Sequence, residues 1–242
     1  MAHIAQDLRG VRRRPQASRA ALSGLMLRLA LIAGILTLAG CPVAYILWPR
    51  WPDQVALDAP MLPITVGGLS LNVPPAAIRL SIQRRSGAQE RLDLVFLWPS
   101  LTPPDPAAKI APGDAMQLTD RVFVTIALND GTPPPLERLK TIYPRYLAGE
   151  TTAGPDGLLA QGFRNDTPYQ GEELFYDAVA VERFLVRCTH DTRIAPGICL
   201  HEQRIMNADI TVRFQREWLK DWRAVASNID RLIADLRPNA WR

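Results

Sequence analysis

The chain has 242 residues, of which 48% are hydrophobic and 21% charged, a composition that excludes wholesale disorder. Its formal net charge of +4 comes from residues 1–48, which carry six arginines and one aspartate, whereas the rest of the chain holds 22 basic and 23 acidic residues. Nucleic-acid binding requires a clustered positive surface, and the main part of the chain has no such excess. We therefore expect no nucleic-acid partner.

The N-terminal segment predicts a membrane anchor. No charged side chain lies between Arg28 and Arg50, and the apolar run over 29–48 is about as long as a helix that crosses a bilayer. The arginines of the tail over 1–28 place that tail in the cytoplasm by the positive-inside rule. We therefore predict a single span over 29–48 in a bacterial inner membrane, with the C-terminal domain in the periplasm.

A second interpretation of the same segment is a lipoprotein signal. The stretch 38-LAGC-41 resembles a processing site after which Cys41 would be lipidated. Pro42 directly follows the cysteine, however, and the apolar run continues to Trp48, where a lipoprotein normally begins a polar linker. Both interpretations stay open, and both place the remaining chain outside the cytoplasm.

The region after the anchor begins with a proline-rich stalk over 49–63, and a domain over 64–242 follows it. Gly67-Gly68 supplies the turn for a hairpin over 64–73. A second hairpin is predicted over 78–98, because apolar residues alternate on both sides of Ser86-Gly87. The apolar positions of this hairpin are Ile78, Leu80 and Ile82 in one strand, and Leu92, Leu94, Phe96 and Trp98 in the other.

The middle of the domain alternates irregular and regular stretches. The segment over 99–114 is too rich in proline for regular structure and predicts a loop. A strand is expected over 121–128, and a short helix over 136–147 that Pro144 ends or kinks. The segment over 149–171 has many turn formers and no clear period, so we expect a long irregular loop there.

The C-terminal part predicts three strands, at about 173–189, 198–206 and 209–214, followed by an amphipathic helix within 215–242. Apolar residues recur there at spacings of three and four, which indicates a helix that covers one face of the sheet. The predicted fold is therefore α+β: a mainly antiparallel sheet with a C-terminal helix. The apolar stripe consists of Trp218, Trp222, Val225, Ile229, Leu232, Ile233 and Leu236.

Two short motifs, 188-CTH-190 and 199-CLH-201, hold both cysteines beyond the anchor and two of the three histidines. Residues two apart share one face of a strand, and a hairpin between the motifs would bring Cys188 and Cys199 together. Outside the cytoplasm such a pair is expected to form a disulfide. Closing a loop of this length would stabilise the fold by roughly 2 to 3 kcal/mol.

The alternatives at this hairpin are a metal site made of Cys188, His190, Cys199 and His201, and a redox-active cysteine pair. The spacing is unlike the common zinc-finger patterns, and a thioredoxin-like Cys-x-x-Cys is absent. No nucleophile elbow, His-Glu-x-x-His motif or phosphate-binding glycine loop occurs in the sequence. We therefore assign no catalytic residue and no cofactor.

The predicted function follows from the tether and from the lack of catalytic motifs. We expect a non-enzymatic interaction or envelope-structural module, anchored through 29–48, whose partner is another envelope protein. One alternative is a metal- or redox-handling protein that uses the Cys188 and Cys199 hairpin. Another is an anchored hydrolase whose acids the sequence does not identify, because the adjacent Glu172 and Glu173 would face opposite sides of a strand.

Overall fold

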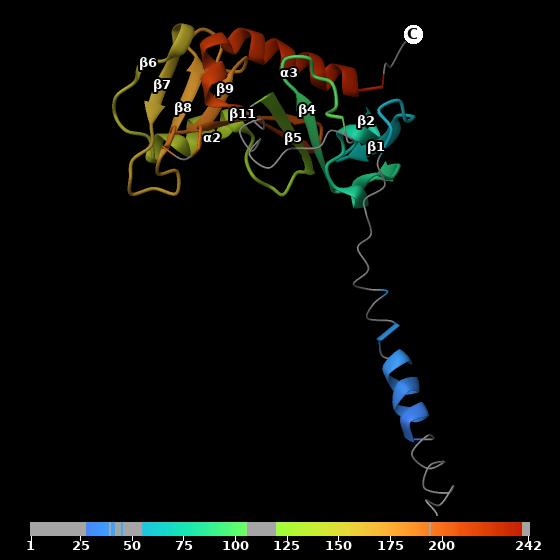
Figure 1. Ribbon diagram of the computed structural model, residues 1–242. Helices are drawn as coiled ribbons and strands as arrows, with labels where there is room; N and C mark the ends of the chain where they lie inside the picture. Colours follow the sequence, from blue (N-terminus) through green and yellow to red (C-terminus); the bar gives the residue numbers. More distant parts are fainter. Residues whose placement is uncertain are drawn as a thin grey trace, which may run out of the picture. The chain divides into compact units, whose positions relative to one another are not determined.

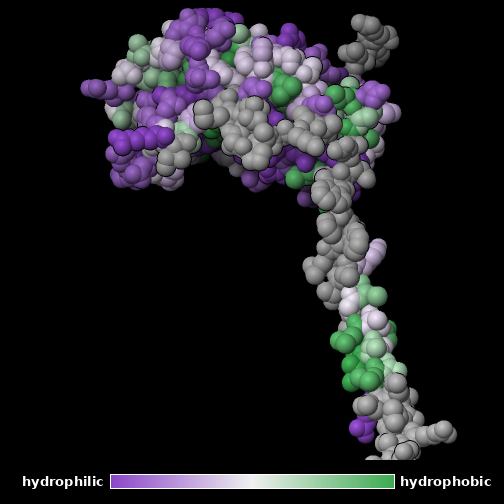
Figure 2. Space-filling view, viewed as in Figure 1, coloured by the Kyte–Doolittle hydropathy of each residue, from purple (hydrophilic) through white to green (hydrophobic). Residues whose placement is uncertain are grey.

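The computed structural model describes residues 28–38, 40, 41, 45, 55–105, 120–193 and 195–238. The chain divides into two compact units, Met1–Pro52 and Asp53–Arg242. In the first unit, residues 28–38 form a helix whose apolar side chains are exposed, and Figure 2 shows them in green. Among the described residues, no helix is both long and apolar enough to cross a bilayer. The predicted span over 29–48 and the predicted tail over 1–28 lie partly outside the described residues.

An eight-stranded antiparallel sheet forms the body of the second unit, in the order β4-β5-β11-β10-β9-β8-β7-β6. With the helix at its C-terminal end, this sheet confirms the predicted α+β class. Its strands are β4 (Arg91–Leu97), β5 (Arg121–Leu128), β6 (Thr152–Ala153), β7 (Leu158–Gly162), β8 (Glu172–Asp177), β9 (Leu185–Thr189), β10 (Ile198–Ile205) and β11 (Ala208–Gln215).

A smaller, three-stranded sheet precedes it in the chain. Strands β1 (Leu62–Val66) and β2 (Leu69–Val73) form the predicted antiparallel hairpin, and β3 (Gly87–Ala88) pairs in parallel with β1. The turn requires glycine at Gly67, where φ is +55° and a Cβ atom would collide with the carbonyl group of Asn207. This close approach holds the hairpin against the turn between β10 and β11.

Helix α3 (Trp222–Leu236) covers one face of the large sheet, and Figure 1 shows it in red, running across the strands. Its buried side chains share one core with β1, β2 and the facing side of the large sheet. All seven residues of the predicted apolar stripe are buried. The stripe therefore covers the domain's own sheet, as predicted, and α3 begins after a 3-10 segment over Arg216–Asp221.

The opposite face of β8 and β9 carries a second, smaller core. Helix α2 (Pro135–Thr141) and the 3-10 turn Tyr143–Arg145 lie on this side, and their aromatic and apolar side chains pack against Leu174 and Leu185. The neighbouring residues Phe175 and Val186 belong to the main core instead. The alternation of β8 and β9 thus serves two cores, one on each side of the sheet.

The prediction of a hairpin over 78–98 is wrong in its first strand. Only Ile78 bridges to β4, at Leu94, and the chain then turns through a 3-10 segment at Ser81–Gln83. Leu80 and Ile82, which the prediction buries, are 48% and 79% exposed. The cause is the buried Gln83 side chain, which accepts a hydrogen bond from the Asp93 N–H group (2.9 Å) and donates one to the Asp93 carboxylate (3.1 Å). A side-chain amide thus takes the place of a neighbouring strand.

Two other expectations also change. The segment expected as one strand over 173–189 is two strands, β8 and β9, separated by a turn in which Asp177 accepts a hydrogen bond from the Val179 N–H group (2.9 Å). The segment expected as an irregular loop over 149–171 contains β6 and β7. Of the loop expected over 99–114, residues after Asp105 lie outside the described part of the chain.

Candidate functional site

The hairpin of β9 and β10 brings Cys188 and Cys199 directly opposite each other, and the two residues form a disulfide. Both are fully buried in the core under α3. The predicted pairing is therefore present. Disulfides persist in oxidising compartments, so this one indicates that the domain folds outside the cytoplasm.

The two histidines of the motifs have opposite surroundings. His190 lies beyond the end of β9, its side chain is 54% exposed, and its Nδ1 atom is 3.5 Å from the Glu173 carboxylate. His201 lies within β10, buried and stacked on Phe184 with ring centroids 5.8 Å apart. Burial lowers the pKa of His201 below its usual value.

The four residues proposed as metal ligands therefore do not form one site. The two sulfur atoms bond to each other, and the two imidazoles lie in different environments. In residues 55–105, 120–193 and 195–238, the structure has no group of three or more Cys, His, Asp or Glu side chains placed to hold a metal ion. The buried disulfide is a structural bond of the core.

Glu172 and Glu173 face opposite sides of β8, as expected from their adjacency. Glu172 pairs with Arg187 at 3.0 Å, and burial raises the pKa of its carboxyl group. Glu173 pairs with Arg216 and lies near His190. Because the two carboxylates do not converge on one space, they do not form the acid pair of a glycoside hydrolase.

A cavity of about 350 Å³ lies beside the part of β10 that does not pair with β9. Pairing between β9 and β10 ends at His201, whereas β10 continues to Ile205, so the second half of β10 has an open edge on that side. The turn between β8 and β9, the start of α2 and one residue of α3 surround this edge. The cavity is lined by Leu136, Val181, Leu185, Glu182, Glu202 and Asp230, among others.

The charges around this cavity are partly paired. Glu202 forms an ion pair with Arg138 of α2 at 2.9 Å, and Arg204 binds Asp209. Within the described part of the chain, Glu182, Asp230 and Arg183, which also lines the cavity, have no ion-pair partner, so the unpaired charge at the cavity is negative on balance. The cavity thus combines apolar walls, an open strand edge and unpaired carboxylates, a combination typical of surfaces that bind other molecules.

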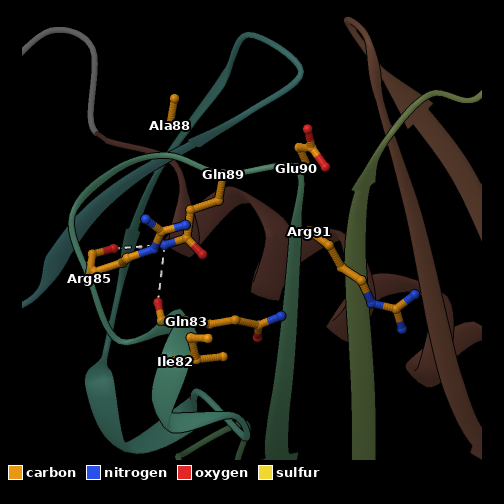
Figure 3. A pocket seen from close by; sticks show the side chains of 7 residues that line it. All are labelled: Ile82, Gln83, Arg85, Ala88, Gln89, Glu90 and Arg91. Carbon is orange, nitrogen blue, oxygen red and sulfur yellow. Dashed lines mark hydrogen bonds between the residues drawn. The ribbon is translucent and has the colours of Figure 1, made fainter.

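A second, more open hollow of about 580 Å³ lies over the turn between Ile82 and Arg91. Figure 3 shows how this turn is held: the Gln89 amide donates hydrogen bonds to the carbonyl groups of Gln83 (3.0 Å) and Arg85 (2.7 Å). Beneath it, hydrogen bonding to the Arg91 guanidinium lowers the pKa of Asp93 to about 2. The turn is thus built from internal bonds, while Ile82 and Arg85 remain exposed.

Neither hollow could be predicted from the sequence. Leu136 of α2, Val181 of the turn between β8 and β9, and Asp230 of α3 are far apart in the chain, and no local pattern connects them. At the second hollow, the alternation of Leu80 and Ile82 indicates buried residues, which is the opposite of their position. The turn depends on the Gln83 amide, which bonds to Asp93. The sequence does not show this pairing, because the two residues meet only in the folded chain.

Comparison with known proteins shows the fold. The sequence matches no protein-family model and no curated protein. Among solved structures, an immunity protein of the Stenotrophomonas maltophilia type IV secretion system is similar, with a TM-score of 0.51 and 15% identity, over 74% of this chain and 94% of that one. The iron-regulated outer membrane lipoprotein FrpD of Neisseria meningitidis matches with a TM-score of 0.41 and 8% identity, over 76% of this chain and 97% of that one. The chain shares its fold with the immunity protein.

Proposed function

We propose that this chain is an immunity-type protein: a membrane-tethered protein of the bacterial periplasm that binds and neutralises a toxic protein delivered by a secretion system. The observation that carries the proposal is the fold likeness to the Stenotrophomonas maltophilia immunity protein, which extends over 94% of that chain. Shared fold alone is an argument by analogy, so the site and the address of the chain must support it independently.

Three features support a membrane-tethered location outside the cytoplasm. Six arginines precede an apolar run over 29–48, helical residues 28–38 expose apolar side chains, and the domain contains a buried disulfide. Lipidation of Cys41, which is exposed and free, is the second way to tether the domain. Either tether holds the domain at a membrane surface outside the cytoplasm, where an incoming toxic protein would meet it.

The surface proposed for partner binding is the cavity at the open edge of β10. An extended segment of the partner would pair with the unpaired half of β10, and one of its side chains would enter the cavity between Leu136 and Val181. The unpaired carboxylates of Glu182 and Asp230 favour a partner segment that carries a lysine or arginine. Leu136 is 39% exposed, so its side chain is accessible to a partner without unfolding of the domain.

A contact-competition experiment tests the proposed function. A strain that lacks the chain is expected to lose viable cells when it grows in contact with its own parent strain, because the toxic protein would act unopposed. The full-length chain should restore survival, and Leu136→Asp should not, because it places a charge at the cavity wall.

The matched control is Met206→Asp, at an exposed turn position with φ +56° that tolerates aspartate. This variant should protect as well as the unchanged chain at equal amounts in the membrane fraction. If the deletion strain survives contact as well as its parent, the immunity function is wrong. If Leu136→Asp protects fully, the binding surface lies elsewhere.

A further inference from the structure

The two parallel strands of the small sheet bring two exposed segments together. Ile64 of β1 pairs with Gly87 of β3, and the Gln89 N–H group bonds to the Thr65 carbonyl at 2.9 Å. Because parallel strands begin at the same end of a sheet, the residues before β1 and those before β3 lie at one end of the domain. Met61 directly precedes β1, and Arg85 comes shortly before β3.

The segments that lead into β1 and β3 expose apolar and basic side chains. Leu57 and Met61 are exposed before β1, and Leu80 and Ile82 are exposed before β3. Residues 78–91 hold four arginines and one glutamate, although residues 49–242 as a whole have nearly balanced charges. We name this surface the stalk-side patch: the exposed residues Leu57, Met61, Leu80, Ile82 and Arg85, with the half-buried Arg84.

Internal hydrogen bonds hold the turn of the patch that carries Ile82 and Arg85. The Gln83 amide is fixed to Asp93, the Gln89 amide closes the turn, and the Arg84 guanidinium donates a hydrogen bond to the Ile78 carbonyl at 3.1 Å. Figure 3 shows the side chains of Ile82 and Arg85 on this turn. An exposed isoleucine held on such a turn costs little ordering entropy when it enters an apolar phase.

The chain connection limits how far this patch can lie from the membrane. Leu57 lies nine positions after Trp48, the predicted end of the anchor, and even a fully extended chain of that length reaches only about 30 Å. We propose that the stalk-side patch docks on the bilayer that holds the chain, with Ile82 and Met61 in the headgroup region and the arginines on anionic phospholipids. This inference rests on the membrane tether of the proposed function and adds an orientation to it.

The physical reason is the pairing of the two side-chain types. Apolar side chains partition into the boundary between headgroups and acyl chains, and cationic side chains near them bind anionic lipid. The docked domain would have its stalk end on the membrane. Docking should therefore depend on anionic lipid and weaken as salt increases.

The oxidation rates of two exposed methionines can measure contact between the patch and the bilayer. Met61 lies in the patch and Met206 lies on the turn between β10 and β11, and their exposed fractions are similar, 59% and 69%. The full-length chain is reconstituted into vesicles of phosphatidylcholine with or without phosphatidylglycerol, treated with hydrogen peroxide and analysed by peptide mass spectrometry. In vesicles with phosphatidylglycerol, Met61 should be oxidised about fivefold more slowly than Met206, because bilayer contact excludes the oxidant.

The controls separate the tether from the docking. Without phosphatidylglycerol, or in the double variant Ile82→Asp, Arg85→Glu, the two methionines should be oxidised at rates within about twofold of each other. If the chain floats with the vesicles but Met61 is not protected in the presence of phosphatidylglycerol, docking is wrong and the tether stands. If the chain does not float with the vesicles, the tether and the docking are both wrong.

Discussion

The two Cys-x-His motifs have the same spacing and opposite surroundings. Strand β10 continues past Cys199, so His201 stays in the sheet, enters the core and stacks on Phe184. Strand β9 ends at Thr189, so His190 leaves the sheet and lies near Glu173 at the surface. The difference teaches that strand length, rather than residue spacing, decides whether a histidine becomes part of a core or of a surface.

The largest expected effect comes from the bond that the two motifs share. The double variant Cys188→Ala, Cys199→Ala should lower the free energy of unfolding by about 2 to 4 kcal/mol, because the disulfide closes an 11-residue separation and fills the core. Urea unfolding of the full-length chain in detergent, followed by tryptophan fluorescence, measures this loss. Cys41→Ala is the control and should leave the midpoint unchanged. A double variant as stable as the unchanged chain would show that the bond contributes nothing to the fold.

Substitution of the buried His201 should reduce the stability of the fold more than substitution of His190. His201→Ala should cost about 2 kcal/mol, since it removes a ring stacked in the core and leaves a cavity. Burial lowers the pKa of His201, so the folded state resists protonation that the unfolded state accepts. The free energy of unfolding should therefore fall as pH decreases below about 6.5, and this dependence should weaken in His201→Ala. An unchanged pH dependence in the variant would assign the effect to other groups.

Substitution of the exposed His190 should change the stability of the fold least. His190→Ala removes a half-exposed side chain whose contact with Glu173 is long, while Glu173 retains Arg216 as its partner. The expected change in unfolding free energy is within about 0.5 kcal/mol, measured in the same urea series. A loss as large as that of His201→Ala would mean that His190 has a structural role that its position does not show.

The elements that the sequence predicted correctly are those set by local signals. Gly67 and Gly68 provide the positive φ angles of the β1–β2 hairpin, and the apolar spacing of α3 identifies both the helix and its buried face. The disulfide followed from the even number of cysteines in the predicted exported domain and from the hairpin between them. In each case the information lies within one helix or one hairpin.

The features that the sequence did not predict depend on contacts between residues that are distant in the chain. Leu80 and Ile82 have the alternation of a strand, yet the Gln83 side chain occupies the hydrogen-bonding position at Asp93 that a longer strand would use. The turn between β8 and β9 contains no glycine or proline and is held by Asp177 instead. The candidate binding cavity draws Leu136, Val181 and Asp230 from separate elements. Side-chain bonds to a remote backbone leave no periodic pattern in a sequence.

The central claim, that this tethered domain binds a toxic protein at the open edge of β10, is tested most directly by photo-crosslinking in intact cells. A photoreactive residue replaces Leu136 or, as the control, Met206 in the full-length chain while neighbouring cells secrete proteins in contact. The account predicts one discrete adduct from position 136 and none from position 206, and the captured protein should inhibit cells that lack the chain. An absence of adducts at position 136, or capture of a protein that is harmless to those cells, would contradict the account.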